Sequence, residues 1–156
     1  STISSRRWSN RMRRSGRHFM RILYVEDHEE LRETIGMLME AEGRSIVLCE
    51  SAEQALVQDA QASFDVVVTD VSLPGISGTE FARQLLVRNP DRWVVLCSGY
   101  ELGEHAQAWG RHVRTLLKPF EVEQLDALLH EIEQALTADS NLVDRAAIQG
   151  CAEASR

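Results

Sequence analysis

The sequence predicts a single α/β domain built on a doubly wound parallel sheet. From residue 21 onward, short runs rich in Val, Ile and Leu alternate with amphipathic stretches. The runs lack polar alternation, which is typical of parallel strands covered on both faces. Five strand–helix units in succession favour right-handed crossovers and helices on both faces of the sheet. A chain of 156 residues, 44% of them hydrophobic, is long enough for one such core.

Five strands are expected, at residues 21–25, 45–48, 65–69, 93–97 and 115–117. The first helix pattern places four apolar residues on one face, namely Leu31, Ile35, Leu38 and Met39. The second opens with a capping-box pattern from Ser51 to Gln54. The third follows Pro74-Gly75, ends near Asn89-Pro90 and presents Phe81, Leu85 and Leu86.

The last two helix patterns differ in strength. Residues 103–110 form a weak, glycine-flanked pattern after the fourth strand. The final pattern is the clearest in the chain, because its apolar residues form one continuous helical stripe: Val122, Leu125, Leu128, Leu129, Ile132 and Leu136.

Charge divides the chain into a basic start and an acidic body. Residues 1–19 hold six arginines and no acid, so against a total of −7 the remaining residues carry −13. We interpret 1–19 as a disordered leader or linker; a nucleic-acid-binding arm and a transit peptide are the alternatives. We expect the domain at 20–138 and a tail or short helix at 139–156, too short for an output domain. The acidic body argues against nucleic-acid binding by the domain itself.

The cysteine pattern and the hydropathy of the chain indicate in which cellular compartment the protein works. The three cysteines are scattered and form no CxxC pattern, which argues against a disulfide framework and a zinc site. No apolar run approaches the length of a membrane span. We therefore expect a cytoplasmic protein without a membrane partner.

The residues that end the predicted strands carry the chemistry. Ligands of open parallel sheets bind beyond the carboxyl ends of the strands. Strand one ends in Glu26-Asp27, strand three in Asp70, strand four in Ser98 and strand five in Lys118-Pro119. We therefore expect three carboxylates, one hydroxyl and one ammonium on one edge of the sheet.

This set fits phosphoryl transfer. Three crowded carboxylates need a compensating cation, and oxygen ligands favour a hard ion such as Mg²⁺. A carboxylate beside the ion can act as a nucleophile toward a phosphoryl group. The ion, an ammonium and a hydroxyl stabilise the charge on the transferring oxygens. Lys118 is the only lysine in the chain, against sixteen arginines, which favours a specific role for its compact charge.

These motifs resemble the receiver domain of bacterial response regulators, over about residues 20–136. The resemblance implies a flavodoxin-like (βα)5 fold with strand order 2-1-3-4-5. It implies Mg²⁺ ligands at Glu26, Asp27, Asp70 and the backbone carbonyl of Ser72, with Asp70 as the phosphoacceptor. Ser98 and Lys118 occupy the Thr/Ser and Lys positions of the family. The Lys118-Pro119 bond is expected to be cis, as in the family's Lys-Pro-Phe segment.

The resemblance also implies a partner. The phosphoryl group would come from a histidine kinase or a phosphotransfer domain, and water would later remove it. Such a protein is a signalling phosphoacceptor rather than an enzyme with an external substrate. The segment from Leu96 to Tyr100, followed by Lys-Pro-Phe, is most similar to receivers of hybrid histidine kinases. We further expect the phosphorylated protein to signal through contacts with a target protein that the sequence does not identify. A homodimer is a second possible partner arrangement.

One position departs from the family pattern. Many receivers carry Tyr or Phe three residues before the lysine, whereas this chain has Thr115. In those receivers, rotation of the aromatic ring reports phosphorylation, and a threonine at this switch position cannot act in that way. Tyr100, two residues after Ser98, is interpreted as a surface aromatic, with a role in water access or partner contact as the alternative.

Two other functions are weighed against the receiver. A haloacid-dehalogenase-type phosphatase also uses an aspartyl nucleophile and Mg²⁺. That class has a D-x-D motif at the nucleophile, with a second acid two residues further on. In this chain the second position is Ser72, so the general acid is missing. A receiver-like scaffold that is not phosphorylated would signal through its surface alone. Thr115 mildly favours the scaffold. The scaffold is disfavoured by the intact set of site residues: Glu26, Asp27, Asp70, Ser98 and Lys118.

Overall fold

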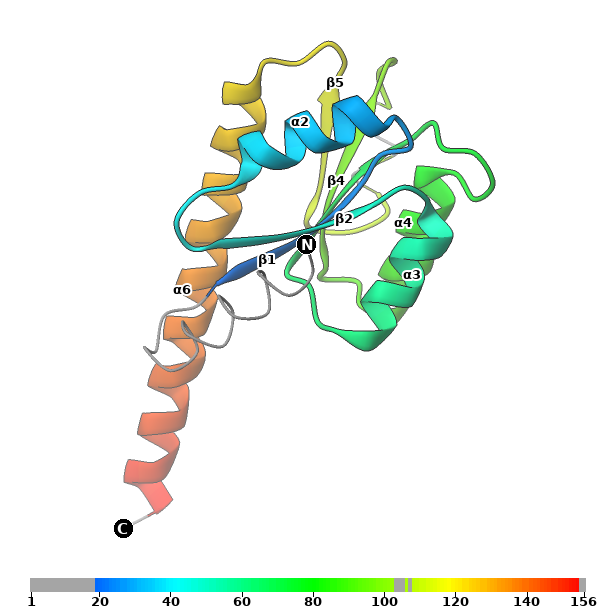
Figure 1. Ribbon diagram of the computed structural model, residues 1–156. Helices are drawn as coiled ribbons and strands as arrows, with labels where there is room; N and C mark the ends of the chain where they lie inside the picture. The colour runs from blue at the N-terminus through cyan, green and yellow to red at the C-terminus, as the bar shows by residue number, and fades with distance from the viewer. Residues whose placement is uncertain (1–18, 103–105, 107, 155–156) are drawn as a thin grey trace. The chain divides into compact units, whose positions relative to one another are not determined.

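A computed structural model describes residues 19–102, 106 and 108–154, with side chains through residue 139. The expected basic leader lies outside the described residues, apart from Phe19. Five parallel strands form one sheet in the order β2-β1-β3-β4-β5, as expected (Figure 1). The strands are β1 (Met20–Val25), β2 (Arg44–Cys49), β3 (Val66–Asp70), β4 (Trp93–Ser98) and β5 (Val113–Leu117).

The expected strands are confirmed with bounds that differ by at most two residues. The three central strands, β1, β3 and β4, are almost entirely buried. The edge strands β2 and β5 are only partly covered, so Leu48 and Leu117 are exposed. The expectation of strands covered on both faces is therefore right for the centre of the sheet and wrong for its edges, where one side has no neighbouring strand.

Helices α2 (Glu29–Met39), α3 (Ala52–Gln61) and α4 (Gly78–Arg88) connect the strands. Each begins after a residue whose side chain accepts a hydrogen bond from the first turn: His28, Ser51 and Ser77. The expected pairing of Ser51 with Gln54 is confirmed, since Ser51 Oγ accepts from Gln54 N at 3.1 Å. Residues 103–105 and 107, half of the weak helix expected at 103–110, lie outside the described residues.

Helices α3 and α4 lie together on one face of the sheet, away from α2 (Figure 1). Beneath them, the alternating side chains Leu23 and Val25 of β1 join Val67 of β3, Phe81 and Leu85 in one buried cluster. Burial of such side chains stabilises the fold by about 1.5–3 kcal/mol each. This cluster packs against both β1 and β3, which pair side by side in the sheet.

The apolar stripe expected on α2 is only half correct. Ile35 and Met39 are buried, whereas Leu31 and Leu38 are 37% and 46% exposed. Helix α2 packs on the edge strand β2, so part of its apolar face extends past the sheet. Gly36 lies at the contact, where an added Cβ would meet Leu48 Cδ2 at 2.8 Å.

Helix α6 runs from Val122 to Ala154 as one element of 33 residues. Residues from Glu123 on form a compact unit of their own. The expected stripe is confirmed in its centre, because Leu125, Leu129 and Ile132 are buried. The helix continues past residue 139 without a break, so the proposed start of a tail there stays a prediction. Within the described residues, no helix combines the length and apolar character needed to cross a bilayer.

Gly78 makes the tightest backbone approach of any glycine near the strand ends. A Cβ at this position would come within 2.0 Å of the Asp70 backbone oxygen, and Gly78 N donates to Val71 O at 2.9 Å. We expect Gly78→Ala to destabilise the protein by about 2 kcal/mol or more, because backbone must move to admit a methyl group. Chemical denaturation measures this.

Gly99→Ala is the matched control, since a Cβ there meets nothing within 4 Å. Equal unfolding free energies for the two variants would contradict the close approach at Gly78.

Candidate functional site

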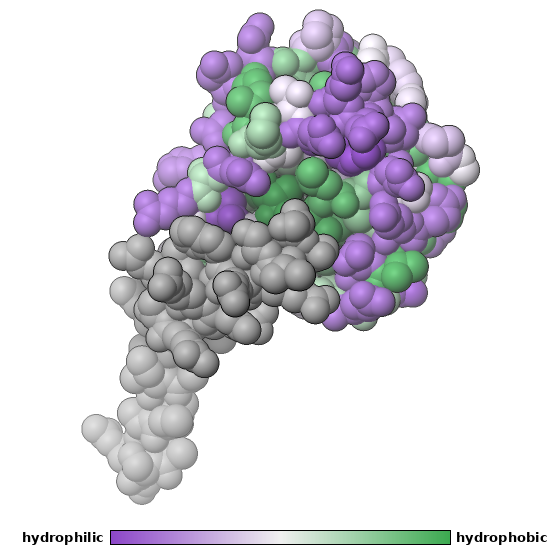
Figure 2. All heavy atoms as spheres, in the orientation of Figure 1, coloured by the Kyte–Doolittle hydropathy of each residue, from purple (hydrophilic) through white to green (hydrophobic). Residues whose placement is uncertain are grey.

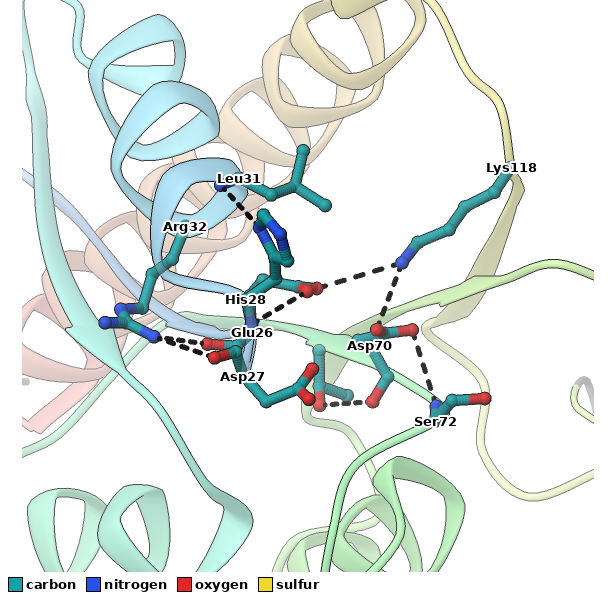
Figure 3. A network of polar contacts seen from close by, with 9 residues as sticks. Glu26, Asp27, His28, Leu31, Arg32, Asp70, Ser72 and Lys118 are labelled. Carbon is teal, nitrogen blue, oxygen red and sulfur yellow. Dashed lines mark hydrogen bonds and ion pairs between the residues drawn. The ribbon is translucent and has the colours of Figure 1, made fainter.

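The carboxyl ends of β1 and β3 bring three acids together. Register pairs Val25 with Thr69, so Glu26 and Asp27, which follow β1, lie beside Asp70 at the end of β3. Each of the three acids offers a carboxylate oxygen, and these oxygens lie within 4.8 Å of one another (Figure 3). Glu26 and Asp70 are buried and Asp27 is exposed. The structure thus brings together the acids expected from the strand ends.

Lys118 reaches the same acids from the end of β5. Its Nζ lies 3.0 Å from Asp70 Oδ2 and 3.8 Å from Glu26 Oε2 (Figure 3). Its backbone N donates to Ser98 O at 2.7 Å, which continues the pairing of β4 with β5. The Lys118-Pro119 peptide bond is cis, as the resemblance implies.

The site is short of positive charge. Burial and, to a smaller extent, the negative charge of Asp70 raise the pKa of Glu26 to about 7, although the nearby charge of Lys118 lowers it. Burial lowers the pKa of Lys118, but the hydrogen bond and charge of Asp70 outweigh this, so its pKa is raised. One ammonium therefore faces three carboxyl groups, and Glu26 loses its proton at a higher pH than an ordinary glutamate does.

A divalent cation fits this arrangement. The excess of two negative charges on Glu26, Asp27 and Asp70 over Lys118 equals the charge of Mg²⁺, and carboxylate oxygens are the ligands it favours. Asp27 lies at the exposed side of the cluster, where waters and a phosphate can reach it. The three carboxylates are therefore the residues that could hold Mg²⁺.

Ser72 lies two residues beyond Asp70. Its backbone N donates to Asp70 Oδ1 at 3.4 Å, so the segment after β3 contacts the carboxylate through its amide. The resemblance assigns the Ser72 carbonyl to the metal, and that role stays a prediction. The absence of an acid here leaves the D-x-D pattern of the phosphatase alternative incomplete.

Ser98 ends β4 on the same edge of the sheet and is buried. Its hydroxyl donates to Tyr100 O at 2.6 Å and accepts from Tyr100 N at 3.1 Å. The hydroxyl is thus held by its own turn rather than by an acid. For it to reach a phosphoryl group on Asp70, the bond to Tyr100 O must open.

Thr115 lies on the edge strand β5 and is exposed, in register with Leu96. Tyr100 lies at the surface as expected, with 57% of the residue exposed, and a role in water access or partner contact stays a prediction. The position of Thr115 is thus open to solvent, without the bulky ring that many receivers place there.

Sequence reasoning missed Arg32. Its Nη1 donates to the backbone oxygens of Glu26 at 2.9 Å and Asp27 at 3.4 Å (Figure 3). It also missed Glu53, whose Oε1 accepts from Ile76 N at 2.9 Å and ties α3 to the loop after β3. The spacing of five residues between Asp27 and Arg32 is only a weak sequence signal for this contact. It does not indicate whether the arginine side chain turns back toward the acidic pair or out into solvent.

A five-stranded doubly wound sheet with three acids and a lysine at its carboxyl edge defines the flavodoxin-like class of receivers used in two-component signalling. Residues 22–130 match the family described as response regulator receiver domain. The chain belongs to that family.

Individual relatives agree with the assignment. The chain is 33% identical over 107 residues to response regulator protein FleR of Pseudomonas aeruginosa, covering 67% of this chain and 23% of FleR. It is 35% identical over 68 residues to sensory/regulatory protein RpfC of Xanthomonas campestris pv. campestris, covering 44% of this chain and 9% of RpfC. The chain thus spans less than a quarter of the length of either relative.

Solved structures show the same fold. Response regulator TrrA of Thermotoga maritima, solved in complex with Mg(2+)-BeF, aligns with a TM-score of 0.66 at 26% identity, over 73% of this chain and 99% of that one. The receiver domain of hybrid histidine kinase CckA aligns with a TM-score of 0.59 at 27% identity, over 72% and 97%.

The raised pKa of Glu26 gives a stability prediction. A folded-state pKa of about 7, against an ordinary 4.5, means that stability falls as pH rises from the lower value through the higher one. We expect Glu26→Gln to stabilise the metal-free protein at pH 8 by on the order of 1 kcal/mol, because it removes a buried charge and keeps an acceptor for His28 N.

The measurement is urea unfolding in chelator at pH 8 and pH 4.5, with Glu33→Gln on the exposed side of α2 as control. The gain should vanish at the lower pH, and a Glu26→Gln protein less stable than wild type at pH 8 would oppose this account.

Proposed function

We propose that this receiver accepts a phosphoryl group on Asp70, in a Mg²⁺-dependent reaction, from a phosphohistidine of a kinase or phosphotransfer domain. The observation that carries the proposal is the meeting of Asp70 with Glu26, Asp27 and Lys118 at one sheet edge. TrrA, a receiver relative with the same fold, was solved in complex with Mg(2+)-BeF, which supports a Mg²⁺ site here.

The transfer is a displacement at phosphorus. A carboxylate oxygen of Asp70 forms a bond to phosphorus while the N–P bond of the phosphohistidine breaks, and its electron pair stays on the imidazole nitrogen, which takes up a proton. Lys118, 3.0 Å from Asp70 Oδ2, places a positive charge where the phosphoryl oxygens arrive. Bound Mg²⁺ supplies further charge neutralisation for those oxygens. Ser98 donates a hydrogen bond after its hydroxyl leaves Tyr100 O.

Removal of the group regenerates the site. Water attacks phosphorus, the bond to the Asp70 oxygen breaks, and inorganic phosphate leaves. We propose that the activity of this domain is its own phosphorylation and dephosphorylation. We place the reaction in the cytoplasm, whose reducing conditions suit the free thiols of Cys49 and Cys97.

The output is proposed to pass through protein contacts. The matches to RpfC and to the CckA receiver favour a hybrid-kinase type of phosphorelay. Thr115 has no ring, and the Ser98 hydroxyl contacts the backbone oxygen of Tyr100, a residue whose aromatic ring is exposed, so we propose Tyr100 as the route from the site to a partner.

Phosphorylation is testable by intact mass. Incubation of the wild-type protein with Mg²⁺ and acetyl phosphate should add one phosphate, and Asp70→Asn should abolish the adduct because the nucleophilic oxygen is lost. Asp91→Asn, an exposed acid before β4, is the matched control and should be labelled as wild type is.

Two outcomes would contradict the proposal. An unlabelled wild-type protein with several phosphodonors would favour the scaffold, and sustained multiple turnover of a phosphomonoester would favour the phosphatase.

A further inference from the structure

Arg32 lies in the first turns of α2 and reaches back to the loop that carries the acidic pair. Its Nη1 donates to Glu26 O at 2.9 Å and to Asp27 O at 3.4 Å. The side chain is partly buried. Figure 3 shows Arg32 on one side of the pair and Lys118 on the other. Two cations thus bracket the acids, one contacting carboxylates and the other contacting backbone.

The Arg32 contacts lie where the hydrogen bonds between β1 and β2 end, so residues 26–28 are held by other bonds. Glu26 N still donates to Cys49 O at 3.0 Å, which extends the pairing with β2 by one residue. His28 N donates to Glu26 Oε1 at 3.3 Å. Arg32 holds the carbonyl oxygens of the same short segment. Together these bonds fix the peptide planes from which both carboxylates project.

We propose that Arg32 is a positioning residue for the metal site, and that it sets Mg²⁺ affinity without contacting the ion. The inference rests on the proposed function. One guanidinium nitrogen carries two N–H bonds in a fixed plane, so it can serve both carbonyl oxygens at once. Groups that orient metal ligands in this way typically contribute about 10–100-fold to metal affinity.

The test uses the full chain and three variants. Arg32→Gln removes the charge and the fork, and Arg32→Lys keeps the charge without the fork. Arg88→Gln removes one positive charge from an exposed position on α4 and is the matched control. Calorimetric titration with MgCl2 gives the Kd of each protein. Hydrogen exchange of residues 26–28 in chelator reports the order of the loop without any metal.

We expect Arg32→Gln to raise the Kd for Mg²⁺ about tenfold and to speed exchange in residues 26–28, while exchange in β4 stays at the wild-type rate. Arg32→Lys should lose most of the affinity as well, and Arg88→Gln should match wild type. The unchanged β4 amides show that a weakened variant is still folded.

Three results would overturn the proposal. The first is a wild-type Kd in Arg32→Gln, and the second is a wild-type Kd in Arg32→Lys, which would assign the effect to charge alone. The third is unchanged exchange in residues 26–28 of Arg32→Gln. If wild-type protein itself binds no Mg²⁺, the proposed function fails, and the exchange rates in metal-free protein still decide whether Arg32 orders the loop.

Discussion

The structure depends on the contact of one ammonium with two buried carboxylates. Lys118 bridges Asp70 and Glu26, and Asp27 adds a third negative group at the exposed rim. Burial, together with the charge of Asp70, raises the pKa of Glu26, and because one positive charge does not balance three negative ones, the site favours a divalent cation. The same imbalance that weakens the metal-free fold suits this edge of the sheet to the Mg²⁺ and phosphoryl group of the proposed function.

The fold produces this contact because parallel strands end at one edge. The register of β1 with β3, and of β4 with β5, places the ends of four strands within reach of one another. Gly78 allows α4 to start against the backbone of Asp70, and Glu53 fastens the loop between them. Each contact restricts the segment after β3, so the carboxylate of Asp70 is held in place in the metal-free structure.

The convergence of the acids and Lys118 could be predicted from the sequence, since uninterrupted apolar runs reveal buried parallel strands and their last residues must share an edge. The reach of Arg32 could not, because several rotamers of a long side chain suit the same spacing. The bond of Ser98 to Tyr100 depends on a turn that the sequence leaves open. The exposed Leu31 and Leu38 follow from the position of β2 at the sheet edge, which periodicity alone does not show.

The most direct test is a crystal structure of the protein grown with Mn²⁺ and beryllofluoride, using the anomalous signal of the metal. The account predicts the metal peak among the carboxylates of Glu26, Asp27 and Asp70, with fluoroberyllate on Asp70 and Lys118 beside it. A metal peak elsewhere, or an unmodified Asp70 with fluoroberyllate bound at another carboxylate, would contradict the account.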